Sequence, residues 1–195
     1  MRFPRDRIYR PPRLGFLRKT AIALLLIAMV VSAWLYAQSN NAKQPVPVAG
    51  QKLVVTDGDS FAVGSIRLRL EGIDAPEIRQ LCRDAKGADW PCGRTARALL
   101  ETLLTQPGLT CEAETHDRYA RSLATCRTGS QIDIAAAMVA QGMALSSEFH
   151  GMRSYGDEED GAKRAKRGLW QGNFDHPADY RSTHAALRTN TVPAE

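Results

Sequence analysis

An uninterrupted apolar segment at residues 20–37 is the feature that most constrains what this chain can fold into. The segment carries no charge, and about 18 apolar residues in a helix just cross the hydrocarbon core of a bilayer. Seven basic residues precede it, and only Asp6 opposes them. Because basic flanks stay in the cytoplasm, the sequence predicts one transmembrane helix, a cytoplasmic N-terminus, and a periplasmic or extracellular remainder.

The same segment has a second interpretation, a signal peptide that is removed on export. The residues Leu35, Tyr36 and Ala37 would then precede the cleavage site. They match it poorly, because a small residue is preferred where Leu35 stands. Retention at the cell membrane and secretion after cleavage both remain open.

Composition changes along the chain predict five parts. These are a basic arm (1–19), the apolar helix (20–37), a Pro-containing polar linker (38–50), a folded domain (51–172), and a polar tail (173–195) that is expected to be mobile beyond His176.

Net charge gives no support for nucleic-acid binding, although the whole chain carries +5. Residues 50–172 hold 16 Lys and Arg against 17 Asp and Glu, a net charge of −1. The basic excess lies in the N-terminal arm, where it serves membrane topology. Binding to a polyanion must therefore depend on individually placed side chains.

Four cysteines, all beyond the apolar segment, agree with an oxidising compartment. No two stand at CxxC spacing, which argues against a zinc site. Two local disulfides, Cys82–Cys92 and Cys111–Cys126, are favoured over free thiols, since each pair is close along the chain.

The folded part predicts a small β-barrel that carries helices, an α+β class for which an OB-fold is the leading candidate. Short β-rich runs come first, and no βαβ alternation follows. The predicted strands are 52–55, 60–63, 66–70, 109–114 and 122–127, and the predicted helices are 93–105, 132–141 and 157–167.

Three acids and two arginines form the candidate site. Asp59 and Asp74 offer carboxylates at adjacent strand ends, and hard divalent cations prefer oxygen ligands. Glu77 could hold or deprotonate a water molecule. Arg69 and Arg121 could clamp a phosphate, because guanidinium groups match its geometry. Together they supply the groups that metal-assisted phosphodiester hydrolysis needs.

The order of these motifs resembles the staphylococcal (micrococcal) thermonuclease family. The motifs that show the resemblance are V-x-D-G-D-S, R-L-R-L-E-G-I-D-A-P-E, D-R-Y-A-R-S-L-A, Q-G-M-A and R-G-L-W. They span about residues 52–170. The resemblance implies a five-stranded OB-fold barrel with about three helices, one calcium ion, and endonucleolytic cleavage of DNA and RNA that leaves 3′-phosphates.

Residue by residue, the resemblance implies that Asp59 and Asp74 are calcium ligands. Ala75 takes the position whose backbone carbonyl completes the protein ligands. Asp57 matches an acid that lies beside the metal ligands.

The resemblance also assigns the groups that handle the substrate. Arg69 and Arg121 match the phosphate-clamping arginines, and Glu77 matches the residue usually named as the general base. Arg118 and Tyr119 match positions that line the nucleotide-phosphate pocket. A monomer is expected, and no protein partner is inferred.

One departure concerns tyrosines that the family carries after Q-G-x-A, which are absent from residues 145–150. Phe149 or Tyr155 is a candidate replacement. Two other functions compete with a nuclease: an interaction module of the same fold that has lost catalysis, and a membrane-anchored envelope protein with no nucleic-acid role. The first would lack some of the five acids and arginines, but all are present.

Overall fold

The computed structural model describes residues 14–40, 43–116, 121–149 and 152–189, in two compact units, Met1–Ala42 and Lys43–Glu195. Helix α1 (Leu14–Asn40) forms the described part of the first unit. Its stretch Arg18–Tyr36 is long and apolar enough to cross a membrane, and its apolar side chains are exposed. A signal sequence near the N-terminus has the same properties, so the helix agrees with either interpretation.

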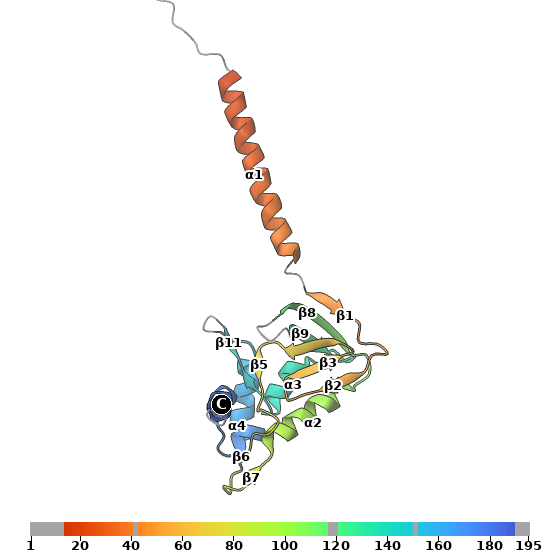
Figure 1. Ribbon diagram of the computed structural model, residues 1–195, viewed down its shortest axis with the longest axis vertical. Coiled ribbons are helices and arrows are strands. Elements are labelled where there is room, and N and C mark those ends of the chain that lie inside the picture. Colours follow the sequence, from red (N-terminus) through yellow and green to blue (C-terminus); the bar gives the residue numbers. More distant parts are fainter. Residues whose placement is uncertain (1–13, 41–42, 117–120, 150–151, 190–195) are drawn as a thin grey trace, which may run out of the picture. The chain divides into compact units, whose positions relative to one another are not determined.

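The second unit is built on a sheet of six strands, counted over its described residues, in the order β1-β8-β9-β4-β3-β2 (Figure 1). Neighbouring strands are antiparallel except β4 and β9, which are parallel. The strands are β1 (Gln44–Val46), β2 (Leu53–Val55), β3 (Ser60–Val63), β4 (Ile66–Leu70), β8 (Thr110–His116) and β9 (Ser122–Arg127). The α+β class is confirmed, and the sheet is consistent with an OB-like fold.

One of these strands was not expected. β1 lies inside the predicted linker 38–50 and pairs antiparallel with β8, with Gln44 opposite Ala113. The physical reason is that β8 has an open edge, whose unpaired backbone groups accept another strand. The sheet therefore has six strands in a linear order, where the sequence predicted a barrel of five.

Strand alternation separates the core from the site. Phe61 and Val63 on β3, with Leu68 and Leu70 on β4, are almost completely buried in the main core. Arg69 points to the opposite face of β4, because successive side chains of a strand alternate.

Helices pack on this sheet and near its ends (Figure 1). They are α2 (Cys92–Leu104), α3 (Ile134–Ala140), α4 (Gly156–Arg164), a 3₁₀ turn (Gly168–Gln171) and α5 (Pro177–Thr189). The first three match the predicted helices within about three residues at each end.

Helix α5 contradicts the prediction of a mobile tail after His176. Pro177 at its first position and Asp179 in its first turn favour a helix start. The polar composition of the tail concealed this signal.

Three short strand pairs complete the second unit. They are β5 (Ile73–Asp74) with β10 (Leu145–Ser146), β6 (Cys82–Arg83) with β7 (Asp89–Trp90), and β11 (Glu148–Phe149) with β12 (Met152–Arg153). The β5–β10 pair fixes the strand that ends at Asp74 against the C-terminal half of the domain.

Both predicted disulfides are confirmed. Cys111 and Cys126 stand directly opposite each other in the β8–β9 pair, with 4.1 Å between their Cα atoms. Cys82 and Cys92 close the loop that follows Glu77, with their Cα atoms 5.7 Å apart. The Cys82–Cys92 disulfide is part of a second, smaller hydrophobic core, so the loop beside Glu77 is anchored by apolar packing.

Candidate active site

Arg69 and Asp59 form the centre of the candidate site. The β3–β4 register places Ser60 opposite Arg69, so the preceding Asp59 lies beside the guanidinium. Arg69 Nη1 donates to Asp59 Oδ1 at 2.7 Å, and Nη2 lies 2.7 Å from Oδ2. Asp59 is 2% exposed, so this two-pronged ion pair is shielded from water.

The second predicted calcium carboxylate shares this guanidinium. Arg69 Nη2 donates to Asp74 Oδ1 at 2.8 Å. Asp74 ends β5, only five residues along the chain from Arg69. One nitrogen therefore lies within 2.8 Å of both Asp59 and Asp74, and the two carboxylates converge on a single cationic atom.

Further hydrogen bonds fix the Asp59 carboxylate. The Ser60 hydroxyl donates to Oδ1 at 2.7 Å, and the backbone N–H of Ala75 donates to Oδ2 at 3.2 Å. Asp57 accepts from the backbone N–H of Asp59 at 3.2 Å. Asp57 and Ala75 thus both contact Asp59, the first through its side chain and the second through its backbone N–H.

Arg121 reaches the same cluster through Ser60. Its Nη1 donates to the Ser60 hydroxyl at 2.8 Å, and that hydroxyl in turn donates to Asp59. The two predicted phosphate-clamping arginines, Arg69 and Arg121, therefore approach Asp59 from β4 and from the residue before β9. Arg118 and Tyr119 lie outside the described residues, so their assignment stays a prediction.

The backbone of Glu77 is held by two hydrogen bonds to Gln80, in the loop that leads to the Cys82–Cys92 disulfide. Its N–H donates to the side-chain Oε1 of Gln80 at 3.2 Å, and its carbonyl accepts from the Gln80 N–H at 2.7 Å. Gln80 is 1% exposed. The side chain of Glu77 is about one-third exposed and faces Asp74 across a guanidinium that the sequence did not predict.

That guanidinium belongs to Arg181 of α5. It donates to both oxygens of Asp74 and to Glu77 Oε1. Hydrogen bonding to Asp74, and to a lesser extent to Glu77, raises the pKa of Arg181 above its ordinary value. The sequence carried a signal for the helix, but none that would direct Arg181 to residues more than 100 positions earlier.

Tyr155, a candidate replacement for the family's tyrosines, has another role in the structure. Its ring packs against the main core, and its hydroxyl donates to Asp133 Oδ1 at 3.5 Å. Burial, with Asp133 second, raises the pKa of Tyr155 to about 12. The side chain of Phe149 is outside the described residues.

Burial also dominates the electrostatics of Asp59. Loss of solvent raises the pKa of Asp59 to about 7, with Arg69 opposing this rise and Asp57 adding to it. The carboxylate is thus costly to ionise in the protein alone, and an added positive charge would favour its ionised form.

The donor set fits a hard divalent cation with few protein ligands. Asp59 and Asp74 supply carboxylate oxygens that already converge on one positive atom. Within the described residues, no group of three or more His, Cys, Asp and Glu side chains is arranged to hold a metal. A backbone carbonyl and water would complete the coordination, as calcium accepts.

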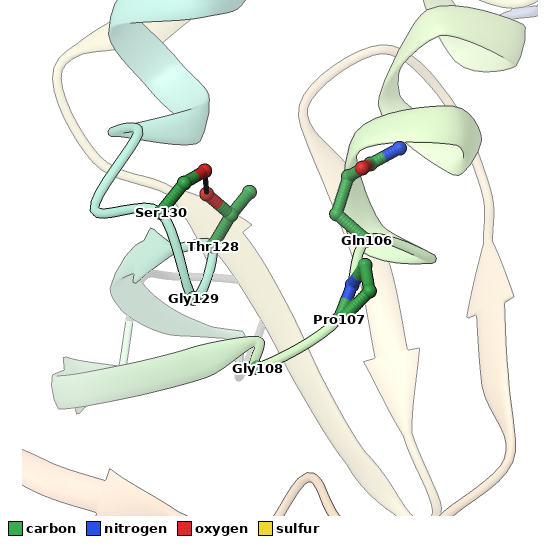
Figure 2. A pocket seen from close by; sticks show the side chains of 6 residues that line it. All are labelled: Gln106, Pro107, Gly108, Thr128, Gly129 and Ser130. Carbon is green, nitrogen blue, oxygen red and sulfur yellow. Dashed lines mark hydrogen bonds between the residues drawn. The ribbon is translucent and has the colours of Figure 1, made fainter.

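Two surface hollows differ in their chemistry. One lies beside Glu77 and is lined by Ile78, Arg79, Gln80, Leu81, Pro91 and Arg94. The other, in Figure 2, is lined by Gln106, Pro107, Gly108, Thr128, Gly129 and Ser130. The second contains no ionisable side chain and none of the predicted site residues. The first is lined by two arginines, and one of them, Arg79, follows Glu77 by two residues.

Comparison with known proteins identifies one matching family. The chain matches the family described as Staphylococcal nuclease homologue over residues 67–172, more than half of its length. The match begins after Asp59 and ends before α5.

Individual relatives agree with this match. The chain is 29% identical to the succinoglycan biosynthesis protein ExoI of Rhizobium meliloti, over 84% of this chain and 82% of that protein. It is 29% identical to the probable endonuclease LCL3 of Pyricularia oryzae, over 68% and 55% of the two chains. It is 27% identical to the probable staphylococcal-like nuclease CAN3 of Oryza sativa, over 80% of this chain and 39% of that protein.

The raised pKa of Asp59 predicts how stability depends on pH in a chelator. The folded state favours the protonated carboxyl, so this contribution is complete below the ordinary pKa of 3.8 and is lost as pH rises through about 7. Three pKa units correspond to on the order of 4 kcal/mol. Urea unfolding from pH 4 to 8 should show the parent losing stability relative to Asp59→Asn. If the parent instead gains stability relative to Asp59→Asn as pH rises, the ion pair with Arg69 outweighs the effect of burial.

Proposed function

The chain belongs to the staphylococcal nuclease family, and on that premise we propose that it is a calcium-dependent nuclease. It would hydrolyse phosphodiester bonds of DNA or RNA within the strand and leave 3′-phosphates. One observation carries the proposal: Asp59 and Asp74 converge on a single nitrogen of Arg69, with Glu77 across the next guanidinium. We take strands β2, β3, β4, β9 and β8 as the OB-type barrel that supports this site.

Asp59, Asp74 and the backbone carbonyl of Ala75 would hold the calcium ion. When bound, the ion supplies a Lewis acid and a template for a phosphate oxygen. Asp57 holds the backbone of Asp59, which keeps the buried carboxylate in place. The hydrogen bonds from Ser60 and Ala75 leave this carboxylate little freedom to turn.

The remaining groups act on water and phosphate. Glu77 would orient a water molecule and accept its proton as the water attacks phosphorus in line with the departing 5′-oxygen. Arg69 and Arg121 would stabilise the charge that develops on the equatorial oxygens. A preorganised donor of this kind contributes on the order of 10²–10³ in rate. Arg118 and Tyr119 would line the nucleotide-phosphate pocket.

The hollow beside Glu77 offers a path for the substrate strand. Arg79 and Arg94, which line it, are exposed, and the apolar Leu81 in the same lining is 54% exposed. Guanidinium groups bind backbone phosphates whatever the sequence of bases. This local placement supplies the attraction that the net charge of the domain does not.

An interaction module without catalysis is the alternative function. Such a module has no need for two carboxylates around one cationic nitrogen, or for Arg121 fixed beside them through Ser60. These contacts favour the nuclease.

We further propose that α1 is retained as a single-pass anchor, with the N-terminus in the cytoplasm and the catalytic domain outside. Its basic flank and exposed apolar side chains support this. The two disulfides agree with an exported domain. The domain is expected to act as a monomer on nucleic acid.

A reporter fusion after Gln38 tests this topology. Alkaline phosphatase folds only after export, so the fusion should be active in cells, while a reporter that works only in the cytoplasm should be silent. The opposite pair of results would reverse the proposed orientation.

Replacing Glu77 by Gln tests the proposed chemistry. The change keeps the size of the side chain but removes its charge and basicity. At saturating calcium, turnover of a fluorogenic oligonucleotide should fall by roughly 10²-fold or more. Arg69→Lys should be nearly as damaging, because lysine keeps the charge but loses the planar fork.

Two comparisons make this result specific. Asp74→Asn should weaken calcium binding, whereas Glu77→Gln should change it only modestly. Glu101→Gln, the same substitution on the exposed side of α2, should leave turnover unchanged. Near-normal turnover in a correctly folded Glu77→Gln protein would remove Glu77 from the mechanism.

A further inference from the structure

Arg181, on the C-terminal helix α5, contacts two carboxylates on which the proposed function depends. Its Nη1 and Nη2 donate to Oδ1 and Oδ2 of Asp74 at 3.0 and 2.9 Å. Nη1 also donates to Oε1 of Glu77 at 3.0 Å. A single guanidinium therefore connects the proposed cation ligand with the proposed base.

The geometry of this contact restrains both carboxylates. A guanidinium that binds both oxygens of a carboxylate fixes its plane as well as its distance. Asp74 receives Arg181 in this way, and its Oδ1 also accepts from Arg69 at 2.8 Å. Glu77 is about one-third exposed, so a bond to a fixed donor decides where its carboxylate points.

Hydrogen bonds hold the segment that leads to α5. The side-chain Nε2 of Gln80 donates to the carbonyl of Asp175 at 2.7 Å, while its Oε1 accepts from the N–H of Glu77. Arg83 and Asn173 exchange two backbone hydrogen bonds of 2.7 and 3.1 Å. The lead-in to α5 is therefore tied to the same loop that carries Glu77.

An ordinary surface ion pair does not account for this arrangement. Exposed pairs contribute little to stability and order little around them. Arg181 instead donates to two carboxylates, and Oδ1 of Asp74 accepts from both Arg181 and Arg69. The segment that leads to its helix is hydrogen-bonded to the almost completely buried Gln80. Two guanidinium groups repel each other, and the carboxylate of Asp74, which accepts hydrogen bonds from both, offsets that repulsion.

We propose that Arg181 is a positioning residue for the nuclease reaction, which fixes the carboxylates of Asp74 and Glu77 relative to each other. The active site then includes α5, which lies beyond the family match at residues 67–172. This inference rests on the proposed function. Alignment of the base with the attacked phosphate is sensitive to shifts of about 1 Å, so loss of Arg181 slows turnover more than it weakens binding.

Hydrogen exchange of the full chain in detergent tests the positioning directly, without any need for nuclease activity. In Arg181→Ala, the amides of residues 77–81 should exchange at least about tenfold faster than in the parent, because local opening becomes easier. The amides of β3 and β4 should be unchanged. Unchanged exchange at 77–81 would overturn the proposal.

Two control variants separate Arg181 from its surroundings. Ser182→Ala changes the next residue of α5, an exposed serine whose hydroxyl donates within its own helix at 2.8 Å. Arg164→Ala removes one positive charge from an exposed position at the end of α4. Neither should alter exchange at residues 77–81. If either control accelerates that exchange as much as Arg181→Ala does, the effect does not belong to Arg181.

Kinetics then test the role in the reaction. With saturating calcium, kcat of Arg181→Ala should fall by about tenfold to a hundredfold, while KM and the Kd for Tb³⁺, a luminescent calcium substitute, stay within about threefold. Arg181→Lys should retain part of kcat, and added guanidinium ion should partly restore the alanine variant. These rescues would not occur if Arg181 only stabilised the fold.

The outcomes against the proposal are distinct. Unchanged kcat would show that Arg181 is dispensable, and increased kcat would show that its contact is inhibitory. A rise in the Tb³⁺ Kd parallel to the loss of kcat would make Arg181 part of the cation site instead. If the parent itself cleaves nothing, the proposed function fails, and hydrogen exchange still decides whether Arg181 positions Glu77.

Discussion

The guanidinium of Arg69 lies between two carboxylates, one from the turn before β3 and one from the end of β5, and the geometry of the candidate site depends on it. Asp59 is almost completely buried, and the cost of that burial is visible in its raised pKa. Two ionised carboxylates that both lie within 2.8 Å of one nitrogen would repel each other if that nitrogen carried no positive charge. Breaking a buried pair by removing one partner costs on the order of 3–5 kcal/mol. The same constraint agrees with the proposed divalent-cation site, because two carboxylates that converge on one positive atom can also converge on a metal ion.

The sheet and the disulfides supply the framework for this arrangement. The β3–β4 register sets Asp59 beside Arg69, and the short β5–β10 pair holds Asp74 at the end of its strand. On the other side of Asp74, the bridge between Cys82 and Cys92 anchors the loop after Glu77 in a small core of its own. The site is thus positioned by paired strands and by a closed loop, and both reduce the movement of the carboxylates.

Much of this site could be predicted from the sequence because its chemistry is local. Asp59, Arg69 and Asp74 lie within 16 residues of chain, on a turn and two strands whose alternation and turn residues are plain. The disulfide between Cys111 and Cys126 followed from the expected hairpin. What escaped prediction depends on distant pairing: β1 adds to the edge of β8, and α5 carries Arg181 to a site 107 residues earlier. No periodicity or spacing within a short window records such contacts, and the polar composition of both segments suggested a linker and a tail.

Cleavage of DNA and RNA by the purified full chain, with calcium and then with a chelator, tests the central claim most directly. The proposed function predicts cleavage in calcium, a loss of at least about 10²-fold in the chelator, and recovery when calcium is restored, since the cation stabilises charge in the transition state. The fragments should end in 3′-phosphates. Cleavage that continues unchanged in the chelator would contradict the role of calcium. Binding of nucleic acid without any cleavage would contradict the nuclease itself and favour the interaction module.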